Sequence, residues 1–285
     1  MKTILYSLFI SLACMLVLAC KKSNVVSVTP SMPVPVVTVY EFEKDPVWQD
    51  EFDIDGLPDA NKWNYDEGGS GWGNNELQYY TKSRSENARA ENGKLIIETI
   101  KEDFSGKKYT SARLVTKRKG DWLYGKFVIR AKIPEGRGTW PAIWMLATDT
   151  NYGTNYWPDN GEIDIMEHVG FDPNRIHGNI HTKAYNHAIQ TNKGNNVVIP
   201  TATSEYHTYT TEWTPVSIKI LIDDNPYFEF KNEGTWQKWP FDKKFHLLLN
   251  IAVGGNWGGQ KGVDDAIFPK RMEVDYVRVY ALKKN

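Results

Sequence analysis

The chain has little cysteine, no marked excess of charge and only one long apolar run. Its two cysteines are Cys14 and Cys20, and cleavage ahead of Cys20 would leave one, which excludes an internal disulfide. Its 34 Lys and Arg residues face 35 Asp and Glu residues, so it lacks the basic excess with which proteins bind nucleic acids. With 41% hydrophobic residues, 24% charged residues and a mean hydropathy of -0.51, it is neither a disordered nor a multispanning protein. A neutral polymer is a better candidate partner than a nucleic acid.

Large aromatic residues, by contrast, are abundant. The 285 residues suffice for one large all-β or α/β domain but are too few for two full domains and a linker. Among them are 11 Trp, 15 Tyr and 11 Phe. Aromatic residues beyond the needs of a core often stack on flat apolar faces, and sugar rings present such faces. The composition therefore favours a carbohydrate partner, without identifying it.

The N-terminal segment is typical of an export signal. Lys2 precedes an apolar run over residues 4–18, which is too short and wrongly flanked for a transmembrane helix. The stretch 17–20, Val-Leu-Ala-Cys, resembles the lipobox of bacterial lipoproteins, in which the cysteine becomes the lipidated first residue. We therefore expect residues 1–19 to be a lipoprotein-type signal peptide and Cys20 to carry the lipid. Ordinary secretion with cleavage nearby is the alternative.

The lipidated protein would belong to the bacterial cell envelope, at the outer membrane or the cell surface, with no membrane contact besides the anchor. Pro30, Pro33 and Pro35 among Ser, Thr and Val favour an extended spacer over residues 20–46. Residues 47–285 then form the globular domain, which we expect to be a monomer.

Alternation of apolar and polar residues predicts strands throughout this domain. Phe127 and Ile129, for example, alternate with Lys126 and Arg130. Such runs recur between turn residues such as Asp-Asp-Asn-Pro at 223–226, with no long helical stripe and no internal repeat. This pattern predicts an all-β fold, an antiparallel sandwich of two curved sheets of the β-jelly-roll type. The predicted strands cover residues 95–100, 125–133, 217–222, 227–230, 245–253 and 272–280.

Three acids lie close together in one predicted strand, residues 161–168. Alternate side chains share a face, so Glu162 and Asp164 point one way while the isoleucines that follow them point into the core. Strict alternation would turn Glu167 inward, but one extra residue, a β-bulge at residues 165–166, restores it to the acid face. We predict that bulge.

Carboxylates on one face repel one another, so at least one of the three should have a raised pKa and hold a proton near neutrality. A retaining glycosidase needs one ionised carboxylate as nucleophile and one protonated carboxylic acid as proton donor, roughly 5 to 5.5 Å apart. Glu162 and Glu167 can meet this requirement by leaning together, although the pattern does not say which glutamate plays which part. A solvated acidic strand face is the alternative.

The acidic strand resembles one in a known family. The stretch 162–167, Glu-Ile-Asp-Ile-Met-Glu, resembles the active-site strand of glycoside hydrolase family 16 in its version with an extra bulged residue. The resemblance extends over residues 48–280, and the stretches 71–80, 138–146 and 250–257 look like the laminarinase branch, which cleaves β-1,3-glucan internally. The resemblance implies a β-jelly roll with an open concave cleft and catalysis without a cofactor.

The resemblance also implies roles for single residues. In it Glu162 is the nucleophile, Glu167 the acid/base and Asp164 the neighbour that orients the nucleophile. Arg113 and Asn74 match positions that hydrogen-bond glucose in the subsites on the non-reducing side. A surface salt bridge for Arg113 and a turn for Asn74 are the alternatives.

Three tryptophans are candidate platforms for glucose rings. Trp140 and Trp144 lie four residues apart on a strand-like stretch and so share a face. Trp257 lies in a glycine-rich loop with little local chain to bury it. Packing in the core or within the loop is the alternative for these residues.

The histidines do not predict a zinc site. His177 and His181 have the spacing of two zinc ligands on a helix, but on a strand this spacing is about 13 Å. We expect His181 to face the cleft and to hydrogen-bond the substrate or Glu167. His168 should point away and be a satisfied core residue.

A structural calcium ion is implied by the resemblance. Asp275 matches a carboxylate ligand in the last strand, and Glu51 and Gly93 match positions that offer backbone carbonyls. A set of oxygen ligands suits calcium. In the alternative, Asp275 pairs with a nearby Lys or Arg.

The expected activity is retaining, endo-acting hydrolysis of β-1,3-glucan of the laminarin type by double displacement. A mixed-linkage β-1,3-1,4-glucanase and a hydrolase of a galactan such as agar or carrageenan are the alternatives among enzymes. A glucan-binding module that keeps the fold but loses the acids is the non-enzymatic alternative, and the presence of all three acids weighs against it.

Overall fold

The computed structural model describes residues 39–283 of the chain. The predicted signal peptide, the lipidation site Cys20 and most of the spacer lie outside the described residues. Phe42, in the last part of the predicted spacer, forms a β-bridge with Leu282 near the C-terminus. The folded unit therefore begins at Tyr40, ahead of the boundary predicted at residue 47. Within the described residues, no helix has the length and apolar character needed to cross a membrane.

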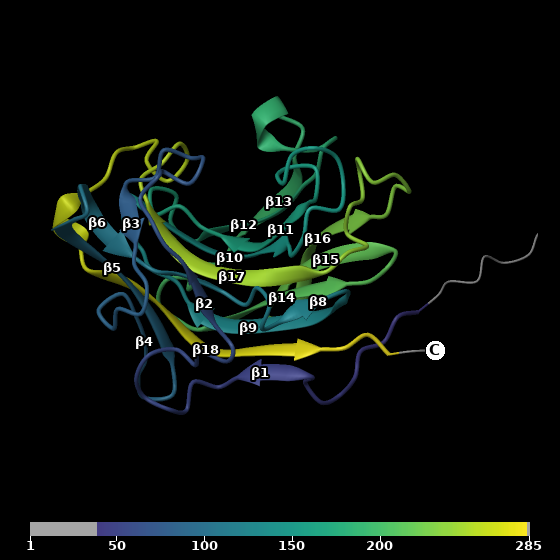
Figure 1. Cartoon of the computed structure of the whole chain (residues 1–285), viewed down its shortest axis with the longest axis horizontal. Coiled ribbons are helices and arrows are strands. Elements are labelled where there is room, and N and C mark those ends of the chain that lie inside the picture. The colour runs from purple at the N-terminus through teal and green to yellow at the C-terminus, as the bar shows by residue number, and fades with distance from the viewer. Residues whose placement is uncertain (1–38, 284–285) are drawn as a thin grey trace, which may run out of the picture. The chain divides into compact units, whose positions relative to one another are not determined.

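Two sheets pack face to face, and neither closes on itself (Figure 1). Helical structure in the described part of the chain is limited to two short 3-10 turns, η1 (His187–Ile189) and η2 (Asp265–Ile267). The expectation of an all-β jelly roll of two sheets is confirmed, and the pairing within them is mainly antiparallel.

The larger sheet has ten strands. They are β1 (Trp48–Asp50), β3 (Gln78–Tyr80), β4 (Ala88–Ala90), β5 (Leu95–Phe104), β6 (Lys107–Ser111), β9 (Gly125–Lys132), β14 (His207–Trp213), β15 (Ser217–Ile222), β16 (Asn225–Lys231) and β18 (Lys270–Tyr280). Their order is β16-β15-β14-β9-β18-β5-β6-β3, while β1 pairs with β18 and β4 with β5. The pairing of β3 with β6 is parallel, whereas the other pairs of this sheet are antiparallel.

The smaller sheet has eight strands and carries the acidic motif. They are β2 (Asn64–Asp66), β7 (Arg113–Val115), β8 (Asp121–Trp122), β10 (Thr139–Ala147), β11 (Glu162–Glu167), β12 (Arg175–His181), β13 (Lys193–Val198) and β17 (Phe245–Val253). Their order is β13-β12-β11-β10-β17-β7-β2, with β8 paired to β17. In Figure 1 the long strand β17 of this sheet is visibly bowed.

Alternate side chains of the two sheets fill the space between them. In β9 the side chains of Phe127, Ile129 and Ala131 are fully buried, whereas the residues between them are half-buried on the other face. Ile163 and Ile165 of β11 are fully buried in the same core. The eight-stranded sheet therefore has an inner apolar face and an outer face that is left for polar side chains.

The hairpin between β15 and β16 differs from the expectation. Asp223 and Asp224 have left-handed φ angles of 48° and 62° and form a two-residue turn. Such angles match a type I′ turn, whose twist suits a hairpin. Asn225 and Pro226, which were expected in the turn, therefore belong to β16, and β5 likewise continues beyond residue 100 to Phe104.

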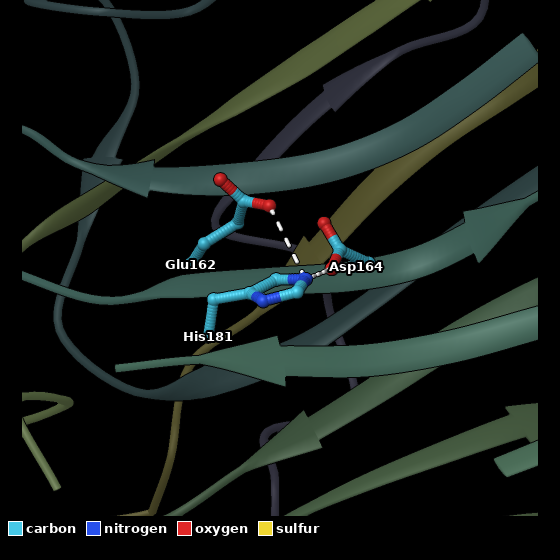
Figure 2. A group of neighbouring side chains, drawn as sticks. All are labelled: Glu162, Asp164 and His181. Carbon is cyan, nitrogen blue, oxygen red and sulfur yellow. Dashed lines mark ion pairs between the residues drawn. The ribbon is translucent and has the colours of Figure 1, made fainter. Parts of the chain in front are cut away.

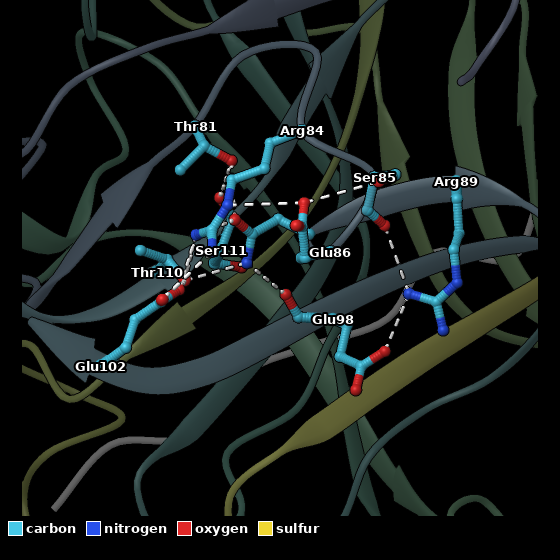
Figure 3. A network of polar contacts seen from close by, with 10 residues as sticks. Thr81, Arg84, Ser85, Glu86, Arg89, Glu98, Glu102, Thr110 and Ser111 are labelled. Carbon is cyan, nitrogen blue, oxygen red and sulfur yellow. Dashed lines mark hydrogen bonds and ion pairs between the residues drawn. The ribbon is translucent and has the colours of Figure 1, made fainter. Parts of the chain in front are cut away.

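A polar network fixes the loop that follows β3 (Figure 3). The Arg84 guanidinium donates to both oxygens of Glu102, at 2.6 and 3.1 Å. The Thr110 hydroxyl also donates to Glu102, and Asn87 Nδ2 donates to Thr110 Oγ1 at 3.0 Å. Two parallel bonds from a guanidinium to a carboxylate fix its orientation as well as its charge. The loop is thereby tied to β5 and β6, beside the parallel pair that β3 forms with β6.

Candidate active site

The three acids of β11 project from the outer face of the eight-stranded sheet. In the ladder with β10, Ile165 has no partner, because the pairing passes from Asp164 directly to Met166. The predicted β-bulge is therefore confirmed. Ile165 and Met166 are both fully buried, so Glu167 returns to the face that carries Glu162 and Asp164.

A glycine lies across from the bulge. β12 has the single residue Gly178 opposite the two residues that separate Asp164 from Glu167. A Cβ on Gly178 would lie 2.6 Å from the hydroxyl oxygen of Tyr227, closer than packed atoms allow. Gly178 therefore leaves room for Tyr227 at the point of β12 that lies opposite the bulge.

Glu162, Asp164 and His181 point toward one another (Figure 2). The His181 Nε2 lies 3.2 Å from an Asp164 oxygen and 3.8 Å from a Glu162 oxygen. The side chains of Asp164 and Glu162 are only 3% and 15% exposed. β12 pairs His181 with Glu162, at the end of the motif away from Glu167. His181 therefore contacts the other two acids and not Glu167, while its hydrogen bond to the substrate, the other partner that we expected, stays a prediction.

Glu167 has its own pair of hydrogen-bond donors. Trp140 Nε1 donates to one carboxylate oxygen at 3.2 Å, and Asn179 Nδ2 donates to the other at 3.1 Å. The sequence prediction omits Asn179. Asn179 precedes His181 by two residues on β12, so the alternation that groups the acids also places these two side chains on one face.

Burial raises the pKa of each of the three carboxyls. The Asp164 charge adds to the rise at Glu162, and the Glu167 charge adds to the rise at Asp164. At Glu167 the His181 charge and the two hydrogen bonds oppose the effect of burial, but the pKa stays above its ordinary value. Buried like charges cannot all ionise at neutral pH, so the group holds at least one proton. This is the state that acid/base chemistry requires.

Trp140 and Trp257 lie together at one end of this face. Their ring centroids are 5.5 Å apart at an interplanar angle of 77°, and Trp257 also meets the His177 ring edge-on at 4.9 Å. The Asn74 carbonyl accepts from the Asn256 N–H at 2.7 Å, which ties the loop of Trp257 to the loop of Asn74. Trp257 thus packs against Trp140 and His177, but its side chain is only half-buried.

Arg113 of β7 lies between two tryptophan rings. Its guanidinium carbon is 4.9 Å from the ring centroid of Trp72 and 4.6 Å from that of Trp144, and its Nε lies 2.9 Å from an Asp66 oxygen. The Arg113 side chain is 11% exposed, so this ion pair differs from the surface salt bridge of the alternative. The half-buried Trp144 donates its Nε1–H to Asn250 Oδ1 at 2.7 Å.

Asn74 lies in the loop between β2 and β3. Its backbone N–H donates to the Gly71 carbonyl at 2.9 Å, so the turn of the alternative is present. Its side-chain Nδ2 donates to a Glu76 oxygen at 3.4 Å. The structure therefore joins Asn74 to a buried acid that the sequence prediction does not single out.

The predicted calcium site contains two ion pairs. The Asp275 carboxylate accepts from Arg130 Nη1 at 2.6 Å, and the Glu51 carboxylate accepts two bonds of 2.8 Å from Arg278. Gly93 lies in the turn between β4 and β5, with a φ angle of 69°. The pairing of Asp275 with an arginine, which was the alternative, is thus present, and it engages one of the two Asp275 carboxylate oxygens.

His168 is buried, as predicted, but it is not a satisfied residue. Neither ring nitrogen has a hydrogen-bond partner among the described residues, and burial lowers the pKa of His168 to about 4. His177 and His181 lie on the strand β12, as expected, so their spacing is not that of a helical zinc pair. The ligand atoms of Glu162, Asp164 and His181 lie within 4.8 Å of one another, so within the described part of the chain this group could hold a metal ion.

The fold and the site define a glycoside hydrolase, because two half-buried glutamates with a buried aspartate between them share the outer face of an open β-sandwich. The chain belongs to the glycosyl hydrolases family 16, whose family model matches residues 75–278.

Individual relatives agree with this assignment. The chain is 59% identical over 240 residues to a beta-glucanase of Rhodothermus marinus, covering 82% of this chain and 84% of that protein. It is 39% identical over 255 residues to a glucan endo-1,3-beta-glucosidase of Cryptopygus antarcticus, covering 81% of this chain and 90% of that protein. Among solved structures, the laminarinase from Rhodothermus marinus has a TM-score of 0.84 at 56% identity, covering 87% of this chain and 100% of that one. The predicted resemblance to the laminarinase-like branch is confirmed.

Proposed function

We propose that this protein hydrolyses β-1,3-glucan of the laminarin type from within the polymer, with retention of the anomeric configuration. The observation that carries this proposal is the bulge in β11, which brings Glu162 and Glu167 to one face with Asp164 between them. The similarity to proteins named as glucanases supports the choice of substrate.

The reaction proceeds in two displacements. In the first, a Glu162 oxygen attacks the anomeric carbon while Glu167 gives its proton to the departing glycosidic oxygen. The bond to the leaving sugar breaks, and an ester between the glucan and Glu162 forms. In the second, the ionised Glu167 takes a proton from water, whose oxygen displaces Glu162. Both glutamates return to their starting states.

The surroundings of Glu167 suit it to the acid/base role. Burial raises its pKa, which favours the protonated carboxyl that the first displacement needs. Trp140 and Asn179 hold its two oxygens in place, and both favour the anion that forms when the proton leaves.

The surroundings of Glu162 suit it to the nucleophilic role. Burial and the Asp164 charge raise the pKa of Glu162 well above its ordinary value, and the His181 charge opposes this rise. Asp164 has a pKa well above its ordinary value because it is buried and faces Glu167. In its protonated form Asp164 removes a repelling charge from beside the nucleophile.

We further propose that glucose rings stack on the tryptophans of this face and that two polar side chains hydrogen-bond the sugars. Each of these side chains is partly exposed, which leaves surface for a ligand. Aromatic faces with a few polar groups fit a neutral polymer better than a charged one. The proposed binding residues are Asn74, Arg113, Trp140, Trp144 and Trp257.

The alternatives differ in substrate or in chemistry. Mixed-linkage glucanases and galactan hydrolases cleave by the same two carboxylates, so only a comparison of substrates separates them. A glucan-binding module needs no acids. This protein instead holds three close together on one face, where partial or full burial raises the pKa of each, and this is costly without a reaction to use them.

Product analysis tests the proposal. The purified protein is incubated with laminarin, mixed-linkage β-glucan and agarose, and short β-1,3 oligosaccharides should appear fastest from laminarin. Glu162→Gln should abolish turnover but keep folding and laminarin binding. Glu212→Gln, on β14 of the other sheet where Glu212 pairs with Lys126, should keep wild-type turnover. Ordinary activity in Glu162→Gln would contradict the assignment, and binding without products would favour the binding module.

Export, oligomeric state and calcium are proposed on narrower grounds. We propose an exported lipoprotein of the cell envelope with Cys20 lipidated, supported by the pattern of residues 1–20, and mass spectrometry of the mature N-terminus tests it. A monomer is the expected state, which sedimentation measures. A structural calcium bound by the Asp275 carboxylate and by the carbonyls of Glu51 and Gly93 is supported by the oxygen donors alone.

A further inference from the structure

Glu76 is a buried carboxylate outside the catalytic group. It is 7% exposed and lies in the loop between β2 and β3. It accepts hydrogen bonds from Gln78 Nε2 at 2.6 Å, from the Tyr80 hydroxyl at 3.3 Å and from Asn74 Nδ2 at 3.4 Å. Burial raises its pKa, so the carboxylate is held at a cost. The two displacements make no use of it, which makes it a candidate for another role.

A chain of hydrogen bonds connects Glu76 to Trp144. Tyr80 donates to Glu76 and accepts from Asn250 Nδ2 at 3.0 Å, and Asn250 Oδ1 accepts from Trp144 Nε1 at 2.7 Å. Tyr80 is fully buried and Asn250 is 6% exposed, so water does not compete for these bonds. The chain ends on a ring whose residue pairs with Asp164 in the β10–β11 ladder.

The direction of these bonds is set by a donor at one end, Trp144, and matched by an acceptor at the other, Glu76. The Trp144 N–H can only donate, so Asn250 must turn its oxygen to Trp144 and its NH2 group to Tyr80. The Tyr80 oxygen accepts that bond, so the Tyr80 proton is left for Glu76. Burial and the Glu76 charge raise the pKa of Tyr80 well above its ordinary value, which keeps this proton in place. A carboxylate, which only accepts, completes the sequence.

We propose that Glu76 is a positioning residue for glucan binding, which through Tyr80 and Asn250 fixes the orientation of the Trp144 indole. The inference rests on the proposed function, because it assigns a role within the binding of that substrate. The Arg113 guanidinium carbon lies 4.6 Å from the Trp144 ring centroid, so a fixed Trp144 ring also fixes the position of Arg113. The effect falls on substrate binding, since the chain of bonds does not include either catalytic glutamate.

Three variants test whether the hydrogen-bond acceptor at position 76, rather than the size of its side chain, is what matters for KM. Glu76→Leu removes the acceptor and should raise KM for laminarin about fivefold, the worth of one hydrogen bond of ~1 kcal/mol, while kcat changes less than twofold. Glu76→Gln should restore KM, because its amide oxygen can accept the Tyr80 proton. Tyr80→Phe breaks the same chain and leaves Glu76 with its other partners, so it should match Glu76→Leu even if Glu76→Leu folds poorly.

A second background tests whether Glu76 acts through Trp144. Trp144→Phe lacks the N–H on which the chain of bonds ends. In that background, Glu76→Leu should leave KM unchanged, because there is no bond left to orient. A merely structural role would raise KM equally in both backgrounds. That result, or a wild-type KM in both Glu76→Leu and Tyr80→Phe, would overturn the inference.

Failure of the proposed function gives a different result. If the wild-type protein binds laminarihexaose without cleaving laminarin, calorimetric affinity replaces KM, and the same pattern across the variants is expected. If it neither binds nor cleaves, both proposals are overturned. If it cleaves normally and the variants do not differ from it, only the role of Glu76 is overturned.

Discussion

Replacement of Trp140 by Phe tests how the protein tunes Glu167. The substitution removes the Nε1–H that donates to Glu167 at 3.2 Å, while an aromatic ring remains to pack against Trp257. That bond and the bond from Asn179 both lower the pKa of Glu167 against the effect of burial. With one donor removed, the carboxylate is less stabilised, and the pKa of Glu167 should rise further.

The size of the effect follows from one hydrogen bond. A bond to a charged group contributes about 1.5–3 kcal/mol, and the distance of 3.2 Å places this one at the lower end. Because about 1.4 kcal/mol is a factor of ten in an equilibrium constant, the proton affinity of Glu167 should rise about tenfold. The first displacement needs protonated Glu167, so the alkaline limb of kcat/KM should move to higher pH.

The assay is the pH dependence of kcat/KM for laminarin, measured for the wild type, Trp140→Phe and Trp144→Phe. Trp144→Phe is the matched control, because the Trp144 N–H donates to Asn250 rather than to an acid of β11. Its alkaline limb should coincide with that of the wild type. An alkaline limb of Trp140→Phe that stays in place or moves to lower pH would refute the reasoning.

Three further predictions concern stability and the bulge. The folded-state pKa of Asp164 lies above its unfolded value, so between the two values the native state binds more protons and loses stability as pH rises. Asp164→Asn should therefore be more stable than the wild type by about 1–3 kcal/mol at alkaline pH and equally stable at pH 3. Urea titrations at the two pH values measure this difference. Deletion of Met166 removes the extra residue and turns Glu167 inward, so kcat/KM should fall at least ~100-fold in a protein with a cooperative melt, and a fall of less than tenfold would speak against the role of the bulge. If calcium binds as proposed, CaCl2 should raise Tm relative to EDTA in the wild type but not in Asp275→Asn. An equal Tm of the wild type in both media would contradict the calcium site and leave Asp275 paired with Arg130.

Local patterns in the sequence were sufficient to predict that Glu162, Asp164 and Glu167 lie on one face of a strand. The alternation over residues 162–167 and the need to turn Glu167 outward predicted the bulge before any partner strand was known, because side-chain direction on a strand has a period of two. The inward isoleucines follow from the same rule, whereas the boundaries of β15 and β17 follow from runs of β-branched or aromatic residues between turn residues.

The partners of those acids could not be read from the sequence. His181 meets Glu162 and Asp164 rather than Glu167, and Asn179 reaches Glu167, because the register of β11 against β12 decides which residues stand opposite. Register and strand order depend on the whole sandwich, so no local period encodes them.

The sequence by itself determined that this is an all-β protein with three acids on one face, since both conclusions depend only on neighbouring residues along a strand. The tertiary structure alone decided that Asp275 meets Arg130 and that Glu76 is connected to Trp144, because each pairing joins segments far apart in the chain. Such contacts form only when strand pairing and sheet packing bring distant segments together, because these two steps decide which donors and acceptors lie within hydrogen-bonding distance.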